Sequence, residues 1–205
     1  MSKILSALLH MKLAKLIPIL IIATLTTTAS ATVFARYYGS TTATVKTPDM
    51  QLVAGSDASG GSSTYPSANV TIASTKDYAT VQISLFPSAA NSPQPATYFT
   101  DLVEIKNNAA SDGHTISQIS ISSISRTSAN DFGKVSVYYC TAQTDDPATT
   151  HTGQYDITSI TGGTVFSGTQ AIAHGASNYI EIVGYAGPSA AAGDTITFTI
   201  SITWV

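Results

Sequence analysis

The sequence predicts an all-β protein, a jelly-roll-like β-sandwich, from three observations. Large apolar residues alternate with Ser, Thr or other polar residues through most of the chain, and this period of two puts them on one face of a strand. The links between these stretches are rich in Gly, Pro, Ser, Asn and Asp, the residues that turns require. Helical periodicity is almost absent after residue 31. Many short strands without intervening helices indicate a sandwich or jelly roll.

The first 31 residues have the pattern of a secretory signal peptide. Lysines precede an apolar run at 16–25, and small residues ending in Ala29-Ser30-Ala31 follow it. The run is about half as long as the ~20 residues that a membrane-spanning helix needs. We therefore expect cleavage after Ala31, a chain that begins at Thr32, and no membrane association after cleavage. A retained membrane anchor is the alternative, and either Met1 or Met11 can be the start.

The composition after residue 31 favours an extracellular, cell-surface protein. This part carries six basic and twelve acidic residues, a formal charge of −6, and 49 of its 174 residues are Ser or Thr. The absence of a basic patch argues against nucleic acids and anionic lipid surfaces as partners. A hydroxyl-rich surface with few charges suits a coat or fibre, because little electrostatic repulsion opposes self-association.

The only cysteine, Cys140, lies in the strand pattern 135–140, so no intrachain disulfide is possible. It is expected to be a small buried hydrophobe; an intermolecular link is the alternative. Without disulfides, the fold must depend on core size, sheet pairing or assembly.

The clearest predicted strand is the last, where every second residue from Ile196 to Trp204 is large and apolar. Around Ile119, Ile121 and Ile124 the alternation slips by one residue, which predicts a β-bulge. In 178–183, the alternation predicts that Ile180 and Ile182 point inward and Glu181 points outward. The nine predicted strands are 50–53, 68–73, 78–86, 100–106, 115–124, 134–141, 155–160, 178–185 and 195–204.

The segment from Thr32 to Gly39 is rich in aromatic and β-branched residues and is predicted to be a strand at a free terminus. It is either the first strand of the protein's own sandwich or a donor strand that completes the sheet of a neighbouring copy. Head-to-tail repetition of strand donation gives a filament. The residues of this strand are Val33, Phe34, Ala35, Arg36, Tyr37 and Tyr38. Because Arg36 is costly to bury, we expect Val33, Ala35 and Tyr37 to enter the acceptor groove.

Several short sequences carry a resemblance to a known family. They are 34–39 (FARYYG), 44–48 (TVKTP), 50–56 (MQLVAGS) and 98–108 (YFTDLVEIKNN), followed by a strand that ends at the C-terminus. Their layout resembles the TasA/camelysin-like biofilm-fibre proteins, and most closely their archaeal relatives that form bundling pili and thread filaments. The resemblance implies a jelly-roll subunit whose N-terminal strand, at 33–38, inserts into the next subunit. The expected organisation is a signal peptide at 1–31, a donor strand and linker at 32–47, and a sandwich at 48–205.

Motifs for catalysis are missing from the sequence. His114, His151 and His174 are far apart, and neither a zinc-protease His-Glu-x-x-His motif nor a Gly-x-Ser-x-Gly elbow occurs. Asp145-Asp146-Pro147 with His151 can supply cation ligands, although a solvated acidic turn is the simpler interpretation. Asp101 and Glu104, three apart on a strand, are expected on opposite faces, which excludes an acid/base pair. We expect no enzyme activity, catalytic residue, metal or cofactor.

The favoured function is a structural subunit of a homopolymeric extracellular filament that serves adhesion or biofilm formation and can bundle with other filaments. A secreted carbohydrate-binding or cell-surface module is the main alternative, with tyrosines that stack on sugars. A type IV pilin-like subunit and a camelysin-like protease are further alternatives. The one N-glycosylation sequon, Asn69-Val70-Thr71, follows a Gly/Ser/Pro loop and is expected to be accessible.

Overall fold

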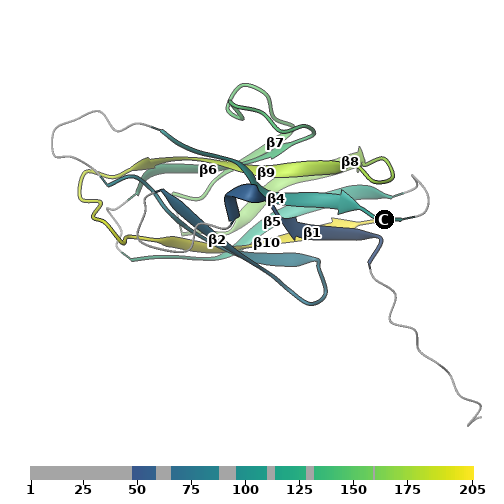
Figure 1. Ribbon diagram of the computed structural model, residues 1–205, viewed down its shortest axis with the longest axis horizontal. Coiled ribbons are helices and arrows are strands. Elements are labelled where there is room, and N and C mark those ends of the chain that lie inside the picture. The colour runs from purple at the N-terminus through teal and green to yellow at the C-terminus, as the bar shows by residue number, and fades with distance from the viewer. Residues whose placement is uncertain (1–47, 59–65, 88–95, 110–113, 128–131, 159) are drawn as a thin grey trace, which may run out of the picture. The chain divides into compact units, whose positions relative to one another are not determined.

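The computed structural model describes residues 48–58, 66–87, 96–109, 114–127, 132–158 and 160–205. They belong to one compact unit that begins at Thr47. This unit is all-β, with ten strands and one short 3₁₀-helix in its described part, which confirms the predicted fold class (Figure 1).

The strands form two five-stranded antiparallel sheets that pack as a sandwich. Sheet A has the order β1 (Met50–Ala54), β4 (Thr97–Asn107), β9 (Ser177–Ala186), β6 (Phe132–Cys140) and β7 (Gly153–Asp156). Sheet B has the order β2 (Ser67–Ile72), β3 (Tyr78–Ser84), β10 (Ile196–Trp204), β5 (Thr115–Arg126) and β8 (Gly163–Ala171). The helix η1 (Ser56–Ala58) follows β1. The chain crosses repeatedly from one sheet to the other, as in a jelly roll.

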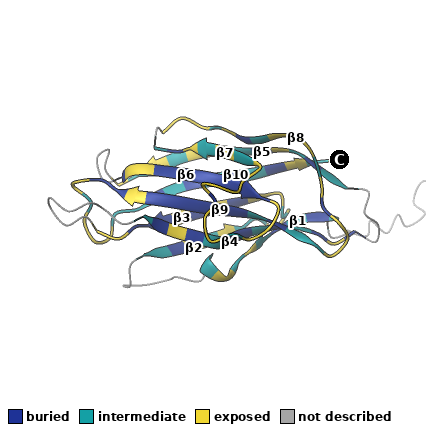
Figure 2. Ribbon diagram, turned by 90° about the horizontal axis from the view of Figure 1, so that it is seen from above, coloured by how far each residue is buried: buried dark blue, intermediate teal, exposed yellow. Residues whose placement is uncertain are grey.

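The core lies between the two sheets and is built by the predicted alternation (Figure 2). In β10, Ile196, Phe198 and Ile200 are fully buried while the intervening threonines face away from the core. Burial of one such side chain contributes roughly 1.5–3 kcal/mol before the entropy cost. Trp204 is half-buried and packs against the same cluster, as expected for the core face of the last strand.

The predicted bulge occurs in β5. Thr197 of β10 is opposite Ser125, but Thr199 is opposite Ser122, so β5 carries one extra residue between these pairs. The backbone accommodates the extra residue at Ser123, whose φ is 53°. The side chain of Ile124 consequently returns to the core. The alternation therefore slips because the backbone inserts a residue.

One strand, β8, is absent from the predicted set. It pairs with β5 from Thr115↔Ala171 to Ile121↔Gly163, at the edge of sheet B. Five of its nine residues are exposed, and Gly163 and Gly168 interrupt its apolar pattern. An edge strand buries too few side chains to show a clear period of two, so the sequence pattern does not reveal it.

The sandwich has two ends, which are named here by the strands that begin or finish there. The proximal end holds the start of β1 at Met50, the start of β5 at Thr115 and the end of β10 at Trp204. The distal end holds the end of β5 at Arg126, the start of β4 at Thr97, the end of β9 at Ala186 and the start of β10 at Ile196. At ~3.3 Å a residue, the length of β5 separates the two ends by roughly 35 Å.

Candidate functional site

The proximal end fixes the point where the described chain begins. Asp49 accepts the N–H of Asn108 through its carbonyl oxygen at 2.7 Å. Its carboxylate lies 3.2 Å from Nε2 of His114. The His114 ring meets Trp204 edge to face, with centroids 5.2 Å apart. The chain therefore joins the sandwich at the end where β5 begins, and whatever precedes residue 48 starts from this end.

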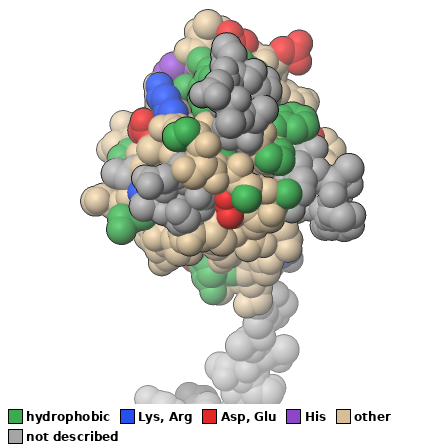
Figure 3. All heavy atoms as spheres, turned by 90° about the vertical axis from the view of Figure 1, so that its left-hand side faces the viewer, with side chains coloured by type: hydrophobic (Ala, Val, Ile, Leu, Met, Phe, Trp, Pro, Cys, Tyr) green, Lys and Arg blue, Asp and Glu red, His purple; other side chains and the backbone are tan. Residues whose placement is uncertain are grey.

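The distal end presents most of the exposed large hydrophobic side chains of the described residues. Four of six lie there: Phe86 (41% exposed), Tyr98 (44%), Ile160 (63%) and Tyr185 (39%). Viewed from this end, hydrophobic side chains lie at several separate places on the surface (Figure 3). Their number, rather than one continuous patch, distinguishes this end from the proximal end.

The side of the sandwich formed by β1 and β2 is covered by short segments. The N–H of Leu52 in β1 donates to the carbonyl of Lys76, in the turn between β2 and β3, at 2.7 Å. Asp57 in η1 accepts the N–H groups of Thr100 and Asp101 of β4, at 2.8 and 3.1 Å. These contacts occupy part of the edge where an incoming strand would pair.

The opposite side is closed because β7 and β8 approach each other across the two sheets. A side chain at Gly153 of β7 would collide with the carbonyl group of Val165 in β8, so this close approach requires glycine. The Tyr155 hydroxyl donates to the carbonyl of Thr161 at 2.9 Å. Little room remains between these two edge strands.

The outer face of sheet A contains a buried carboxyl group. Glu181 of β9 is 0% exposed, and its Oε1 accepts the N–H of Thr144 at 3.0 Å. Its Oε2 is buried without a hydrogen-bond partner in the described part of the chain. Burial, with smaller contributions from Asp101 and Asp145, raises the pKa of Glu181 to about 7.

Loop 141–152 lies against this face, since Thr144 contacts Glu181 and His151 contacts Tyr138. Tyr138, Cys140 and Val183 form a second, smaller apolar cluster there. Cys140 is buried, as predicted for a small hydrophobe. Burial and the neighbouring Glu181 raise the pKa of its thiol to about 12, so the thiolate is strongly disfavoured.

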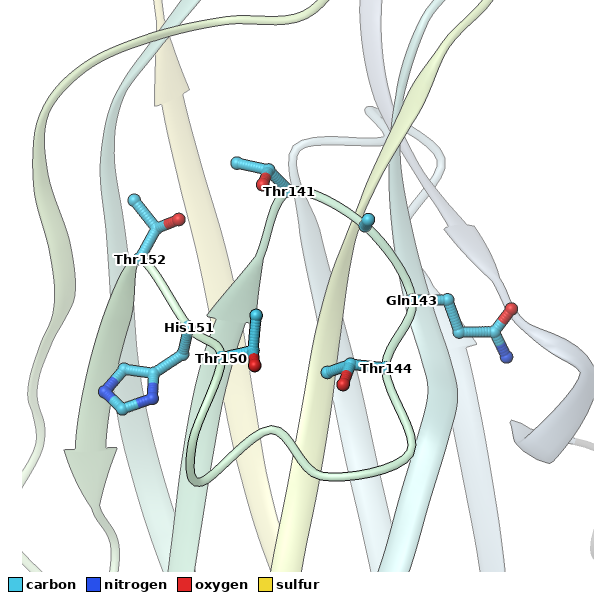
Figure 4. A pocket seen from close by; sticks show the side chains of 7 residues that line it. Thr141, Gln143, Thr144, Thr150, His151 and Thr152 are labelled. Atoms are coloured by element: carbon cyan, nitrogen blue, oxygen red, sulfur yellow. The ribbon is translucent and has the colours of Figure 1, made fainter.

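The hollow within loop 141–152 has a volume of about 400 Å³ and is lined mainly by threonines. Figure 4 shows His151 and Gln143 pointing away from each other on either side of the loop. Nδ1 of His151 lies 2.8 Å from the carbonyl oxygen of Pro147, and its ring rests on Tyr138. The loop therefore brings no set of catalytic side chains together.

The remaining candidate residues are dispersed. Within the described ranges, no three His, Cys, Asp or Glu side chains are grouped as a metal site. The ring of His174 bonds to the carbonyl of Ala109. Asn69 is exposed on edge strand β2 opposite Gln82, as expected for an accessible sequon. The predicted donor residues Val33 to Tyr38 lie outside the described residues.

The expectation that Asp101 and Glu104 occupy opposite faces is wrong. The pairing of β4 with β9 is irregular between Phe99 and Val103, so strict alternation fails there. Burial raises the pKa of Tyr179, and both carboxylates add to this effect. Both therefore act on the same tyrosine on one side of sheet A.

No protein-family profile and no curated protein matches this chain. None of the described residues forms a helix long and apolar enough to cross a membrane.

Proposed function

We propose that this protein is the structural subunit of an extracellular filament, assembled by donation of the strand at 33–38 to the next copy. The observation that carries the proposal is the polarity of the sandwich. The described chain begins at the proximal end, beside His114, while four of the six exposed large hydrophobic side chains of the described residues lie at the distal end. The segment before residue 48 is attached at one end of the sandwich, and exposed hydrophobic side chains lie at the other. This arrangement fits a head-to-tail interface, which propagates without closing.

The chemistry of the surface supports a structural role. The described strands carry seven charged residues in all, so neighbouring subunits repel each other weakly. The resemblance to TasA/camelysin-like fibre proteins points the same way, and it also favours assembly into bundles. Adhesion or biofilm formation is the role that we assign to such a filament.

The test is substitution of the donor strand. Val33→Asp with Tyr37→Asp places two charges on the face that we expect to be buried, and should abolish filaments while the sandwich keeps its melting temperature. Thr44→Asp, in the expected linker, is the matched control and should assemble normally. Negative-stain electron microscopy of sheared surface material, with N-terminal sequencing, gives the readout.

Three results are decisive. Filaments whose subunit begins at Thr32 and that disappear in the double variant support the proposal. Normal filaments from the double variant overturn strand donation. Filaments that retain residues 16–25 overturn it in favour of a pilin-like helix.

A carbohydrate-binding function is the second candidate, and one feature favours it. Tyr98 pairs with Val183, and Tyr185 lies two residues further along β9 on the same face. The two exposed rings are thus diagonal neighbours on sheet A, at the spacing where side chains interact. Aromatic pairs of this kind can stack on a sugar. If Tyr98→Ala with Tyr185→Ala abolishes retention on insoluble polysaccharide while a soluble monomer persists, this candidate replaces the filament.

A further inference from the structure

The second half of β5 is paired along one side. Its first half, Thr115 to Ile121, lies between β10 and β8. Beyond Ile121, β10 continues alongside β5 as far as Arg126. The pairing of β8 with β5, in contrast, stops at Ile121↔Gly163, where β8 begins. Among the described residues no strand takes the place of β8 next to Ser122–Ser125. Ser122, Ser123 and Ser125 are exposed accordingly.

The residues just before β8 do not extend that strand alongside β5. Gly162 crosses so close to β5 that an added Cβ would lie 2.6 Å from the carbonyl oxygen of Ile121. Ile160, two residues before Gly162, is 63% exposed, although a large apolar side chain gains free energy by burial. Within the part of the chain that the structure describes, pairing therefore stops at this point, and the row beside Ser122–Ser125 is open.

A hollow lies beside this open row. It has a volume of about 370 Å³ and is lined by Ile124, Ser125, Arg126 and Ile160. Ile124 reaches the hollow because the bulge at Ser123 turns its side chain toward the core. An incoming strand here would place alternate side chains against Ile124 and Ile160 and extend sheet B by backbone hydrogen bonds.

We propose that the open half of β5, Ser122–Ser125 with Ile160 beside it, is the acceptor site for residues 33–38 of a second copy of this chain. The inference rests on the proposed function and adds where the donor strand binds. The donor extends sheet B along the row that β8 occupies beside the first half of β5. Val33, Ala35 and Tyr37 face the hollow, and Phe34 and Arg36 face outward.

The chain outside the described residues is long enough for this exchange. Nine residues separate Tyr38 from residue 48, and fully extended they span at most roughly 32 Å. The acceptor lies at the distal end, whereas the described chain begins at the proximal end. Donation between copies therefore stacks the subunits in one direction.

The first test is Ile160→Asp. Its side chain is largely exposed in the free subunit, so the fold should be unchanged, but an unpaired charge facing the donor strand should lower the assembled fraction about tenfold or more. Ser167→Asp is the matched control, since Ser167 is exposed in the middle of β8, away from both ends. Sedimentation of assembled material measures both variants, and circular dichroism checks their fold.

The outcomes separate this inference from the proposed function. Loss of assembly in Ile160→Asp but not in Ser167→Asp supports the acceptor site. If Ile160→Asp assembles like the wild-type chain while the Val33→Asp, Tyr37→Asp variant does not, strand donation stands and the open half of β5 is not the acceptor. If the wild-type chain forms no polymer, both proposals fall.

A disulfide test locates the contact directly. Ser125→Cys is combined either with Phe34→Cys or with Arg36→Cys, because opposed strand residues have Cα atoms close enough for a disulfide. One combination should give a ladder of covalent oligomers on a non-reducing gel, whereas Ser120→Cys with either partner, in the half of β5 already paired with β8, should not. A link confined to single chains means that the strand folds back on its own subunit, and overturns the proposal, as does the absence of any link in wild-type-like filaments.

Discussion

The outer faces of the two sheets are built by the same alternation but differ in charge. The strands of sheet A carry six charged residues, Asp101, Glu104, Lys106, Lys134, Asp156 and Glu181. The strands of sheet B carry one, Arg126, at the distal end of β5. On sheet B, hydroxyl groups form cross-strand rows instead, such as Thr71, Thr80, Thr199 and Ser122.

The difference follows from what covers each face. Loop 141–152 seals part of sheet A, so the polar groups beneath it must find partners within the protein. Apart from Ser84, which bonds to Ser67, the outer side chains of β3 and β10 in sheet B are exposed or half-buried, and water can satisfy them. Substitutions on the covered face of sheet A should therefore lower the free energy of unfolding more than substitutions on the open face of sheet B.

The largest effect is expected for Glu181→Ala at pH 5. It leaves the N–H of Thr144 without its acceptor and removes atoms from a fully buried site, which should cost about 2–3 kcal/mol of the free energy of unfolding. Thr199→Ala, on the middle strand of sheet B, is the control and should cost about 1 kcal/mol or less. Urea unfolding of both variants measures the difference, and equal losses would contradict the comparison.

The second effect is the pH dependence that Glu181 creates. In the folded protein the pKa of Glu181 is raised to about 7 from the ordinary value of 4.5. Between these values the folded state binds more protons than the unfolded state, so stability is fully present below pH 4.5 and is lost as pH rises through 7. We expect Glu181 to lower the free energy of unfolding on the order of 2 kcal/mol between pH 5 and pH 8.

Glu181→Gln isolates this contribution, because the amide keeps an acceptor for Thr144 and does not titrate. The variant should be more stable than the wild-type chain at pH 8, and the gap should narrow or reverse at pH 5. Parallel stability curves for the two proteins over this range would show that the buried carboxyl group is not the cause.

Much of the sandwich could be predicted from sequence because its strands bury one face against a shared core. Eight strands and the bulge near Ile124 follow from periodicity, which is a local property of the chain. The ninth prediction, 155–160, coincides with β7 only at Tyr155 and Asp156. The edge strand β8 could not be predicted, because exposed residues and glycines weaken that period. The alternation of β9 gave the outward direction of Glu181, but not the burial of that residue. Burial depends on loop 141–152, whose path over the sheet is set by contacts distant in sequence.

The candidate acceptor site could not be predicted from sequence for a related reason. The slip in alternation near Ile124 is visible in the chain, and it does mark a bulge. The open row beside Ser122–Ser125 depends on where β8 ends, and β8 is the strand that the pattern fails to reveal. A local signal can thus locate an irregularity, whereas the pairing of the neighbouring strands decides whether it borders an open edge.

The smallest effect tests whether the outer face of sheet B is open to solvent in the free subunit. Thr80 and Thr199 are direct cross-strand partners. Thr80→Lys with Thr199→Lys should be less stable than Thr80→Lys with Thr199→Glu by about 1 kcal/mol, because opposed like charges repel and opposite charges attract. High salt should shrink this gap, since exposed charges are screened. If both pairs instead unfold the protein, the charges have entered a covered surface, and the contrast between the two faces fails. A modest, salt-sensitive gap in the monomer that widens on assembly would show that neighbouring subunits cover this face in the polymer.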